Sequence, residues 1–460
     1  MERDGAHIPF VSSGPYPIRP GNLVRPIVDG EPAFRRICQA VEQARHSAWV
    51  TVAFIERDMQ MPDGRGTFFD VLDRAKARGI DVRALFWRSP ELEQVEPGAH
   101  FPGTDEQRVW LRERGSVFVA RWDRAAKLYC QHQKSWLVDA GHAGEVAFVG
   151  GINLNRGSMV APGHQSGPGE STHDVYVELQ GPAATDVHHN FVQRWNESSE
   201  RGDAGGLWPD ARSQGDLAFP RTLSSSRGVV PVQIQRTVRR GLYRDGTAAP
   251  GAKPFEIANG DGSIADQYLR AIAAAERSIY IEDQAIAQPQ VIAGLQAALE
   301  RGVEVVFLVP ADPNTEMARA RQTPEAAPLF ASIAALGRFE NFALAGIASP
   351  SGDGGYRNVY VHAKIALVDD VWATIGSTNI ANRSFYGDTE LNASFWHRPT
   401  VHALRCELLL EHLGRETSAL DDREALRLYR DSARRNALRH ARGEPLDGLA
   451  FALDPATYAG

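Results

Sequence analysis

The chain has 460 residues, of which 43% are hydrophobic and 23% charged, a balance typical of a globular protein with two or three domains. No apolar run approaches the roughly 18 residues that a membrane-spanning helix needs, and the first ten residues do not resemble a secretion signal. Only three cysteines are present, without metal-site spacing, and the formal charge is −7 without a basic block. We therefore expect a cytoplasmic protein without a disulfide framework, a zinc site or a nucleic-acid partner.

The predicted elements alternate between helices and short strands, and their order occurs twice along the chain. Residues 75–87 predict the end of a helix followed by a strand, with Gly79 as the helix C-cap. Residues 298–310 repeat this pattern with Gly302 in the same position. Such alternation is typical of α/β folds. We therefore expect two pseudo-symmetric halves, each a mostly parallel β-sheet flanked by helices.

Composition suggests where the halves begin and end. We expect the first half at 31–200, after an N-terminal extension at 1–30, and a linker rich in Ser, Gly and Asp at 201–228. The second half is expected at 229–460. It ends in an arginine-rich amphipathic helix at 423–443, which either packs on the domain with a solvated face or contacts lipid headgroups. Long loops are predicted at 156–173, 244–263 and 346–357, and loops of this length are either functional lids or merely mobile segments.

One duplicated motif carries the chemistry. QHQKSWLVD matches VHAKIALVD, and both have the form H-x-K-x-x-x-x-D. On a strand, residues two positions apart face the same way, so the His and Lys of each motif share a face while the Asp has the opposite parity. If the halves meet about a pseudo-twofold axis, two histidines and two lysines converge on one pocket. The motif residues are His132, Lys134 and Asp139 in the first half, and His362, Lys364 and Asp369 in the second.

These residue types suit a phosphodiester, because ammonium groups neutralise phosphoryl oxygens while one imidazole serves as nucleophile and the other as general acid. Asn153 and Asn379, three residues beyond Gly150 and Gly376, and Ser377 are expected to donate hydrogen bonds to the phosphate. Neighbouring ammonium groups would repel a cation. We therefore expect no metal and no other cofactor.

An imidazole used in this way needs an acceptor at its other nitrogen. Asp174, in THDVYVEL, and Glu390, in GDTELNASF, begin the next strand after each motif and are our candidates. Glu282 and Gln284 are predicted to share a strand face in the second half. The remaining histidines have no matching partner and are expected at the surface or in helix caps.

The duplicated motif, followed by GG or GS and an asparagine, resembles the signature of the phospholipase D superfamily. AFVGGINLNRG at 147–157, YIEDQ at 280–284 and YVHAKIALVDDVWATIGSTNIANRS at 360–384 look like the phosphatidyl-transferring phospholipases D of eukaryotic type. The resemblance implies the phospholipase D fold, with the active site at the interface of the halves. It also makes His132 the nucleophile and His362 the general acid.

The resemblance extends to the other site residues. It implies phosphate binding by Lys134, Lys364, Asn153, Ser377 and Asn379. It implies that the histidines are oriented by Asp174 and Glu390. It places the strand that contains Glu282 and Gln284 near the substrate pocket, and we expect both side chains to bind substrate. Structural roles fall to Asp139, Asp369, Gly150, Gly151 and Gly376. The half-sites are not equivalent, since the first motif has four extra residues before its glycine pair and Gly151 stands where the second half has Ser377.

The expected reaction is hydrolysis or transphosphatidylation of a glycerophospholipid by a monomer at a membrane or vesicle surface, with water or an alcohol as acceptor. Headgroup, acyl preference and the balance of the two outcomes stay open, since pocket shape and water access decide them. Three alternatives remain: a cardiolipin-synthase-like phosphatidyltransferase, a nuclease or other phosphodiesterase of the same superfamily, and a catalytically silent lipid- or phosphate-binding protein.

Overall fold

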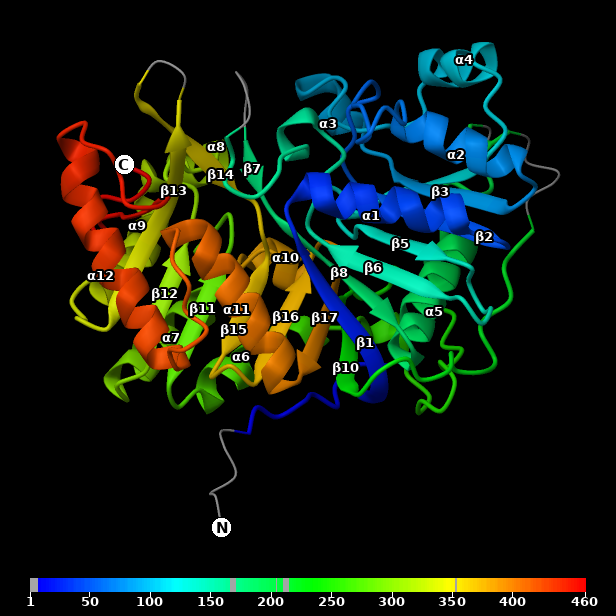
Figure 1. Cartoon of the computed structure of the whole chain (residues 1–460). Helices are drawn as coiled ribbons and strands as arrows, with labels where there is room; N and C mark the ends of the chain where they lie inside the picture. The colour runs from blue at the N-terminus through cyan, green and yellow to red at the C-terminus, as the bar shows by residue number, and fades with distance from the viewer. Residues whose placement is uncertain (1–6, 166–170, 204, 210–214, 352–353) are drawn as a thin grey trace.

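The computed structural model describes residues 7–165, 171–203, 205–209, 215–351 and 354–460, in which helices and strands alternate through both halves (Figure 1). The first half contains β1 (Arg19–Val28), α1 (Gly30–Gln43), β2 (Ser47–Val52), α2 (Phe68–Ala77), β3 (Asp81–Trp87), α3 (Pro90–Val95), α4 (Asp105–Glu113), β4 (Val119–Asp123), β5 (Ser135–Val138), β6 (Val146–Gly150), β7 (Thr172–His173), β8 (Val175–Gln180), α5 (Pro182–Glu197) and β9 (Leu207–Trp208).

The second half continues in the same manner. It contains β10 (Val230–Thr237), α6 (Ser263–Ala274), β11 (Ser278–Glu282), α7 (Pro289–Glu300), β12 (Glu304–Leu308), α8 (Thr315–Arg321), α9 (Ala327–Leu336), β13 (Phe342–Pro350), β14 (Tyr356–Val361), β15 (Ile365–Val368), β16 (Trp372–Gly376), α10 (Asn382–Tyr386), β17 (Glu390–Trp396), α11 (Arg398–Leu413), α12 (Asp422–Ala441) and β18 (Ala450–Ala452).

The two halves repeat one strand order. Strands β2, β3 and β4 are parallel neighbours in the first half, as are β11, β12 and β13 in the second. Beside β2 follow β5, β6 and β8, and beside β11 follow β15, β16 and β17, all antiparallel to their neighbours. Gly79 and Gly302 adopt φ of 87° and 83° after their helices, as helix C-caps do. The duplicated α/β architecture predicted from the sequence is confirmed.

Each sheet is mixed, which corrects the expectation of mostly parallel sheets. The motif strand β5 is antiparallel to both of its neighbours, and β15 repeats this arrangement. Only residues 139–145 separate β5 from β6, whereas a parallel crossover needs about a dozen or more residues. The chain must therefore turn back after each motif. The alternation of helices and strands in the sequence therefore explains only the parallel strands, β2 to β4 and β11 to β13.

Strand β1 joins the two halves. Its first residues pair with β10, with Arg19 opposite Val232, and the rest pairs with β8, with Val28 opposite Val175. Strand β10 pairs in turn with β17, so one sheet runs without a break through both halves. The segment expected as an N-terminal extension thus supplies a strand of the fold.

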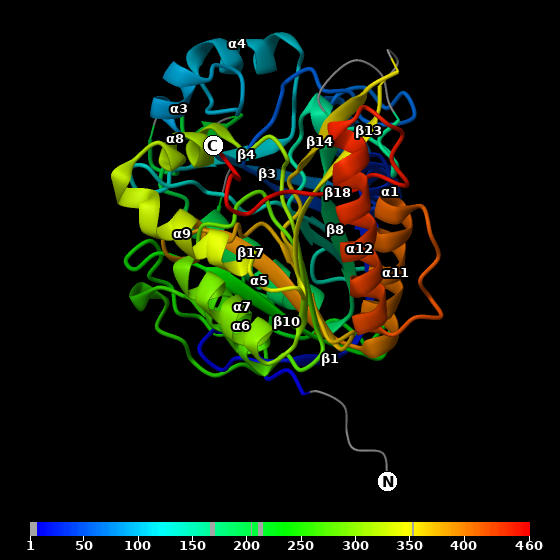
Figure 2. The same ribbon diagram turned by 90° about the vertical axis from the view of Figure 1, so that its left-hand side faces the viewer.

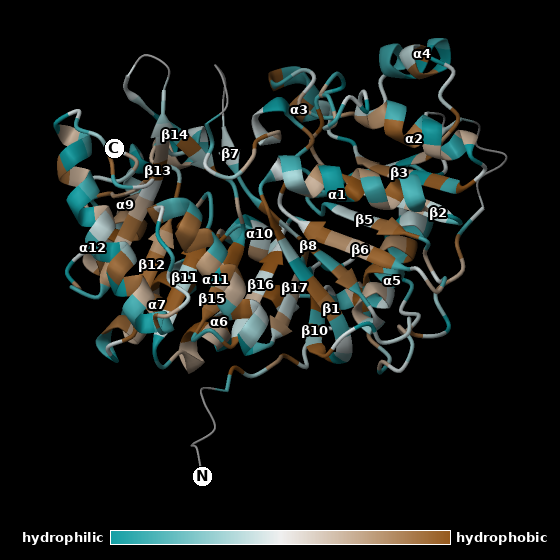
Figure 3. Cartoon of the chain, viewed as in Figure 1, coloured by the Kyte–Doolittle hydropathy of each residue, from teal (hydrophilic) through white to brown (hydrophobic). Residues whose placement is uncertain are grey.

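The main core lies between the halves. Buried apolar side chains of β6 and β8 belong to one cluster with those of β16 and β17, as Val149, Val177, Ala373 and Leu391 illustrate. Helices α1 and α2 cover the outer face of the first sheet, and α6, α7 and α9 cover that of the second (Figure 2). Strands such as β6 and β12 are accordingly hydrophobic along most of their length (Figure 3). This packing fixes the two motifs relative to each other.

Helix α12 is the predicted arginine-rich C-terminal helix. Asp421 caps its N-terminus in a capping box with Glu424. Its apolar face is buried, with Tyr429 in the main core, and Arg430 forms an ion pair with Glu304 of β12. The helix therefore packs on the domain. None of the helices in the described part of the chain has the length and apolar content needed to cross a bilayer.

Two of the predicted long loops contain regular structure. Residues 346–357 belong largely to β13 and β14, which pair as an antiparallel hairpin, and 352–353 lie outside the described residues. Gly, Ser and Pro residues concentrate between the two strands in the sequence, which is why the composition predicted a loop. Residues 156–173 include β7, which pairs with β14 of the other half, and 166–170 lie outside the described residues.

Candidate active site

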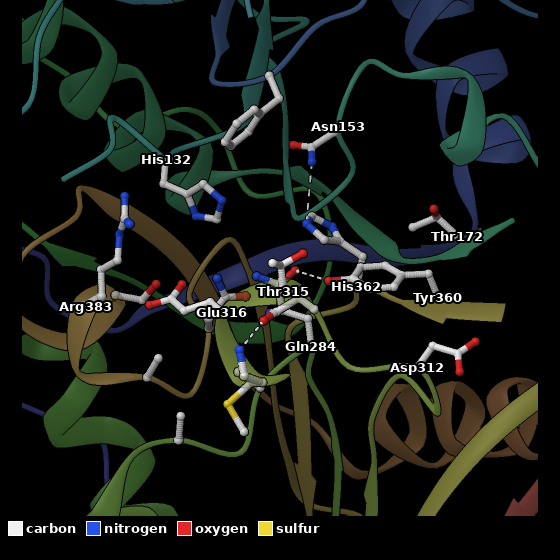
Figure 4. A pocket seen from close by; sticks show the side chains of 18 of the residues that line it. His132, Asn153, Thr172, Gln284, Asp312, Thr315, Glu316, Tyr360, His362 and Arg383 are labelled. Atoms are coloured by element: carbon white, nitrogen blue, oxygen red, sulfur yellow. Dashed lines mark hydrogen bonds between the residues drawn. The ribbon is translucent and has the colours of Figure 1, made fainter. Parts of the chain in front are cut away.

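A cavity of about 960 Å³ lies between the halves and is lined by both motif histidines. His132 lies three residues before the start of β5, and His362 lies three residues before the start of β15. Asn153 and Asn379 line the same cavity. Figure 4 shows His132 and His362 projecting into it from different segments, with Asn153 beside His362. The two motifs thus converge on one pocket, as the pseudo-twofold arrangement predicts.

Each histidine is held by a carboxylate from the opposite half. His132 Nδ1 lies 3.0 Å from both carboxylate oxygens of Glu390, at the start of β17. His362 Nδ1 lies 2.6 Å from Oδ2 of Asp174, which directly precedes β8. With Nδ1 used in this way, Nε2 is the nitrogen left for chemistry on each ring. Both predicted acids are therefore at the site, and their pairing is crossed between the halves.

The two lysines are buried beside the histidines. Lys134 Nζ donates to the main-chain carbonyl oxygen of His132 at 2.9 Å, and Lys364 Nζ donates to that of His362. Burial lowers the pKa of Lys134 to about 8, and burial also lowers the pKa of Lys364. At neutral pH this places two ammonium groups under the site, where they can attract an anion.

The same charges and burial keep both imidazoles neutral. Burial, followed by the ammonium groups of Lys134 and Lys364, lowers the pKa of His132 well below its usual value. Burial, followed by Lys364, lowers the pKa of His362 to about 3. Burial raises the pKa of Glu390 to about 7 against the opposing effect of Lys134. Both imidazoles are therefore neutral near neutral pH, and with Nδ1 facing a carboxylate each Nε2 is left unprotonated.

Asn153, Asn379 and Ser377 differ in their hydrogen bonds. Asn153 Nδ2 lies 3.5 Å from His362 Nε2. The Oδ1 atoms of Asn153 and Asn379 are buried and have no hydrogen-bond partner among the described residues. Ser377 instead donates its hydroxyl hydrogen to Glu390 and accepts the main-chain N–H of Leu391. Its hydroxyl hydrogen is thereby committed to holding Glu390, and the phosphate contact of Ser377 stays a prediction.

Comparison with known proteins agrees with this geometry. Residues 158–288 match the family model described as Phospholipase D, and residues 268–409 match that described as Cardiolipin synthase, PLD-like domain. The first match contains Asp174 and the second contains His362 and Glu390, while His132 precedes both. The chain belongs to the phospholipase D superfamily.

Individual relatives are distant members of the superfamily. The chain is 24% identical to phospholipase D alpha 2 of Oryza sativa subsp. japonica over 89% of its length, and spans 66% of that protein. It is 27% identical to cardiolipin synthase A of Pseudomonas entomophila (strain L48), with 90% of this chain and 74% of the relative covered. Its fold resembles the crystal structure of phosphatidylserine synthase of Haemophilus influenzae Rd KW20, with a TM-score of 0.55 at 13% identity over 91% and 92% of the chains.

The motif aspartates of this superfamily member are structural anchors away from the cavity. The carboxylate of Asp139 accepts the main-chain N–H groups of residues 45–47, where α1 leads into β2. Asp369 accepts those of residues 276–278, where α6 leads into β11. Each carboxylate thus fixes the start of the strand next to its own motif, which is consistent with the opposite parity of the aspartates.

The glycines after each motif allow close approach of neighbouring segments. A Cβ on Gly150 would lie 2.4 Å from the carbonyl oxygen of Val175, and one on Gly151 would lie 2.5 Å from Oδ1 of Asp174. A Cβ on Gly376 would lie 2.0 Å from Oδ1 of Asn392. Real Cβ atoms essentially never come this close to another atom, so a side chain at Gly151 would displace the carboxylate that contacts His362.

Gln284 and Glu282 do not share a face. Gln284 lines the cavity and accepts a hydrogen bond from Tyr360 at 3.4 Å. Glu282 is fully buried and accepts hydrogen bonds from His173 Nε2 at 2.9 Å and the Tyr280 hydroxyl at 2.6 Å. The expectation that Glu282 contacts substrate is therefore corrected. Strand β11 ends at Glu282, so its two-residue alternation does not continue to Gln284.

A buried cluster next to the cavity was missed by sequence reasoning. Its centre is His173, whose Nδ1 lies 3.0 Å from Asp29 and whose Nε2 lies 2.9 Å from Glu282 of the other half. Against the opposing effect of burial, these carboxylates raise the pKa of His173 well above its usual value. With a carboxylate at each nitrogen, both ring nitrogens are placed to donate a hydrogen bond, as in an imidazolium. Its position directly before Asp174 was the available signal.

The cluster also contains the donors suited to a divalent cation. Among the described residues, two overlapping groups have ligand atoms close enough together: Asp29, His164, His173 and Glu411, and His173, Glu282 and His412. His173 cannot be a ligand while both of its nitrogens carry hydrogen. His164, expected at the surface, is buried here because its ring faces Asp29 and Glu411.

Further cavity residues flank the motifs. Cys130 and Tyr360 line the cavity two positions before His132 and His362, so the alternation that pairs each histidine with its lysine could also have found them. Burial raises the pKa of Cys130 well above its usual value, which leaves an unreactive thiol. The ring of Phe54 packs edge-on against His132 at 6.0 Å between centroids. No sequence pattern around Phe54 indicates a role at the site. The residue lies beside His132 because the fold brings the two segments together.

Proposed function

We propose that this protein is a phospholipase D that hydrolyses glycerophospholipids or transfers their phosphatidyl group through a phosphohistidine intermediate. The observation that carries the proposal is the crossed arrangement of His132 with Glu390 and His362 with Asp174 at one cavity. Two oriented imidazoles above two buried ammonium groups provide a nucleophile, a proton carrier and charge neutralisation for a phosphodiester.

In the first step, Nε2 of His132 attacks phosphorus while Nε2–H of His362 protonates the oxygen of the leaving headgroup. A P–N bond forms and the P–O bond to the headgroup breaks. Burial and the ammonium groups lower the pKa of His362, and the negative charge of a bound diester would offset the effect of these ammonium groups. The diester therefore favours uptake of the proton that the first step consumes.

In the second step, His362 removes a proton from water or an alcohol, which attacks the phosphohistidine. The new P–O bond replaces the P–N bond, and His132 returns to its neutral form. Water gives phosphatidic acid and an alcohol gives a new phospholipid. The carboxylates of Glu390 and Asp174 stabilise the imidazolium character that develops on each ring.

A cardiolipin-synthase-like reaction is the second candidate. The match of residues 268–409 to the cardiolipin synthase model and the 27% identity to the Pseudomonas entomophila protein favour it. The chemistry is the same, and only the acceptor differs, a phosphatidylglycerol hydroxyl taking the place of water or a small alcohol. The two candidates are therefore distinguished by acceptor choice.

The test is product analysis on phosphatidylcholine vesicles with added ethanol. Phosphatidylethanol should form with the wild type, disappear with His132→Ala and with His362→Ala, and persist with His440→Ala, a histidine of α12 outside the cavity. A parallel reaction on phosphatidylglycerol would show cardiolipin if the second candidate is right. Full turnover by His132→Ala would overturn the mechanism.

A further inference from the structure

The loop that precedes His132 holds a leucine out in solvent. The N–H of Tyr129 donates to the carbonyl oxygen of Ala126 at 2.9 Å, which closes a turn with Lys127 and Leu128 as its central residues. Leu128 is 77% exposed, the largest fraction among the large apolar side chains of the described residues. Its φ of 73° is unfavourable for any residue with a Cβ. The folded chain thus keeps a leucine in a strained conformation without burying it.

The base of this loop is fixed at the cavity. Cys130 lines the cavity and donates its N–H to Asp388 at 2.6 Å, while Thr389 donates its N–H to the carbonyl oxygen of Cys130 at 3.0 Å. The ring of Tyr129 covers Gly387 so closely that a Cβ there would lie 1.9 Å from it. The second half therefore supports the loop, and its tip stays at the rim of the active site.

Two more exposed apolar side chains stand on neighbouring segments. Val95, at the end of α3, is 75% exposed, and Leu92 of the same helix packs on a small cluster that includes Phe54 and Cys130 of the cavity wall. Tyr386, at the end of α10, is 52% exposed and directly precedes the glycine covered by Tyr129. We call Val95, Leu128 and Tyr386 the apolar rim.

The charges near the apolar rim have both signs. Lys127 is exposed at the loop tip and has no ion pair among the described residues. Arg383, which lines the cavity, is partly exposed and paired with Asp388. Helix α3 contributes the acidic side chains of Glu91 and Glu93. This mixture, on a chain of net charge −7, suits a zwitterionic surface better than a strongly anionic one.

We propose that the apolar rim inserts into the surface of a phosphatidylcholine-type bilayer and so brings a lipid headgroup to the cavity. The inference rests on the proposed function for the nature of the substrate. Apolar side chains gain free energy on entering the interface, and the ammonium of Lys127 can stay at the level of the lipid phosphates while its methylene chain is buried. Contact with hydrocarbon would account for an exposed leucine held in a strained turn.

The experiment measures vesicle binding and turnover separately. A variant with Leu128→Ser and Val95→Ser is compared with wild type for cosedimentation with phosphatidylcholine vesicles, for kcat/KM on those vesicles, and for kcat/KM on the soluble diester bis(p-nitrophenyl) phosphate. Matched controls are Val229→Ser and Leu438→Ser, 73% and 63% exposed on other surfaces. We expect vesicle binding and vesicle kcat/KM of the rim variant to fall about tenfold or more, with soluble turnover and the controls within about twofold.

Each other outcome would overturn the proposal. Unchanged vesicle binding would show that the rim does not insert. Equal losses on vesicles and on the soluble diester would place the effect in the site itself. A change in oligomeric state measured by light scattering would assign the rim to a protein contact. Failure of the proposed function would look different, because vesicle binding through the rim would persist without any lipid turnover.

Discussion

His132 and Glu390 lie 258 positions apart in the chain and 3.0 Å apart in the structure, with Nδ1 of the imidazole facing the carboxylate. The pair joins the two halves across the cavity, so neither half contains a complete His–acid pair. Asp174 and His362 repeat the relationship in the opposite direction. The duplicated halves thus form one active site, in which the histidine of each half is paired with the carboxylate of the other half.

Replacing Glu390 with glutamine should therefore impair catalysis more than folding. The amide keeps the size of the side chain but removes the charge that stabilises His132 and fixes its tautomer. We expect kcat on the soluble diester to fall about 100-fold or more, by analogy with the general effect of losing the acid of such a pair. Glu340→Gln, an exposed residue, is the control. Near wild-type kcat would show that the pair does not act in catalysis.

The pH dependence should be a narrow bell. Burial raises the pKa of Glu390 to about 7, so below that pH the carboxylate that holds His132 is protonated and activity falls. Burial lowers the pKa of Lys134 to about 8, so above that pH the ammonium is lost and activity falls again. The measurement is kcat/KM on the soluble diester from pH 5 to 10, in which both limbs refer to the free enzyme.

Lys134→Arg tests the alkaline limb. The variant should be slower, because a guanidinium and an ammonium differ in geometry. Its kcat/KM should no longer fall near pH 8, because a guanidinium does not titrate in this range. If the alkaline limb stays unchanged, another group is responsible for it.

The sequence predicts those features of the fold that depend on short segments of the chain. Alternating helices and strands, the glycine C-caps and the duplicated order are properties of short segments, and they revealed the architecture. Strand direction is different, because it depends on how the chain returns after each motif. The antiparallel β5 and β15 follow from connection lengths that the hydrophobic pattern does not highlight.

The same distinction holds for the site: its residues could be predicted from the sequence, but their contacts could not. The motif spacing identified both histidines, both lysines and the two carboxylates, because each lies within one half's repeat. The crossed pairing arises only when the halves pack together. Ser377 turned toward Glu390 and Glu282 toward His173 because buried carboxylates and rings need partners, a requirement that becomes visible only in three dimensions.

The nucleophile can be assigned with a substrate whose leaving group needs no proton. On bis(p-nitrophenyl) phosphate, His362→Ala should release a burst of p-nitrophenol close to one equivalent per protein and then stop, because water activation in the second step requires the missing base. His132→Ala should give no burst. The phosphoenzyme can be counted by mass spectrometry after rapid quenching. A burst from His132→Ala with none from His362→Ala would exchange the two roles.

His173 is the test of the buried cluster. The imidazolium neutralises Asp29 and Glu282, which come from different halves and are both fully buried. His173→Gln can donate from only one atom and leaves the carboxylates without a positive charge, so we expect a loss of about 3–5 kcal/mol in the free energy of unfolding. Denaturant unfolding near pH 7 measures it, with His440→Gln as the control on α12. The same substitution should also lower kcat on the soluble diester. The main-chain carbonyl oxygen of residue 173 accepts the N–H of His362, and Asp174, the next residue, orients the imidazole of His362. An unchanged stability would show that the carboxylates are neutralised by other means.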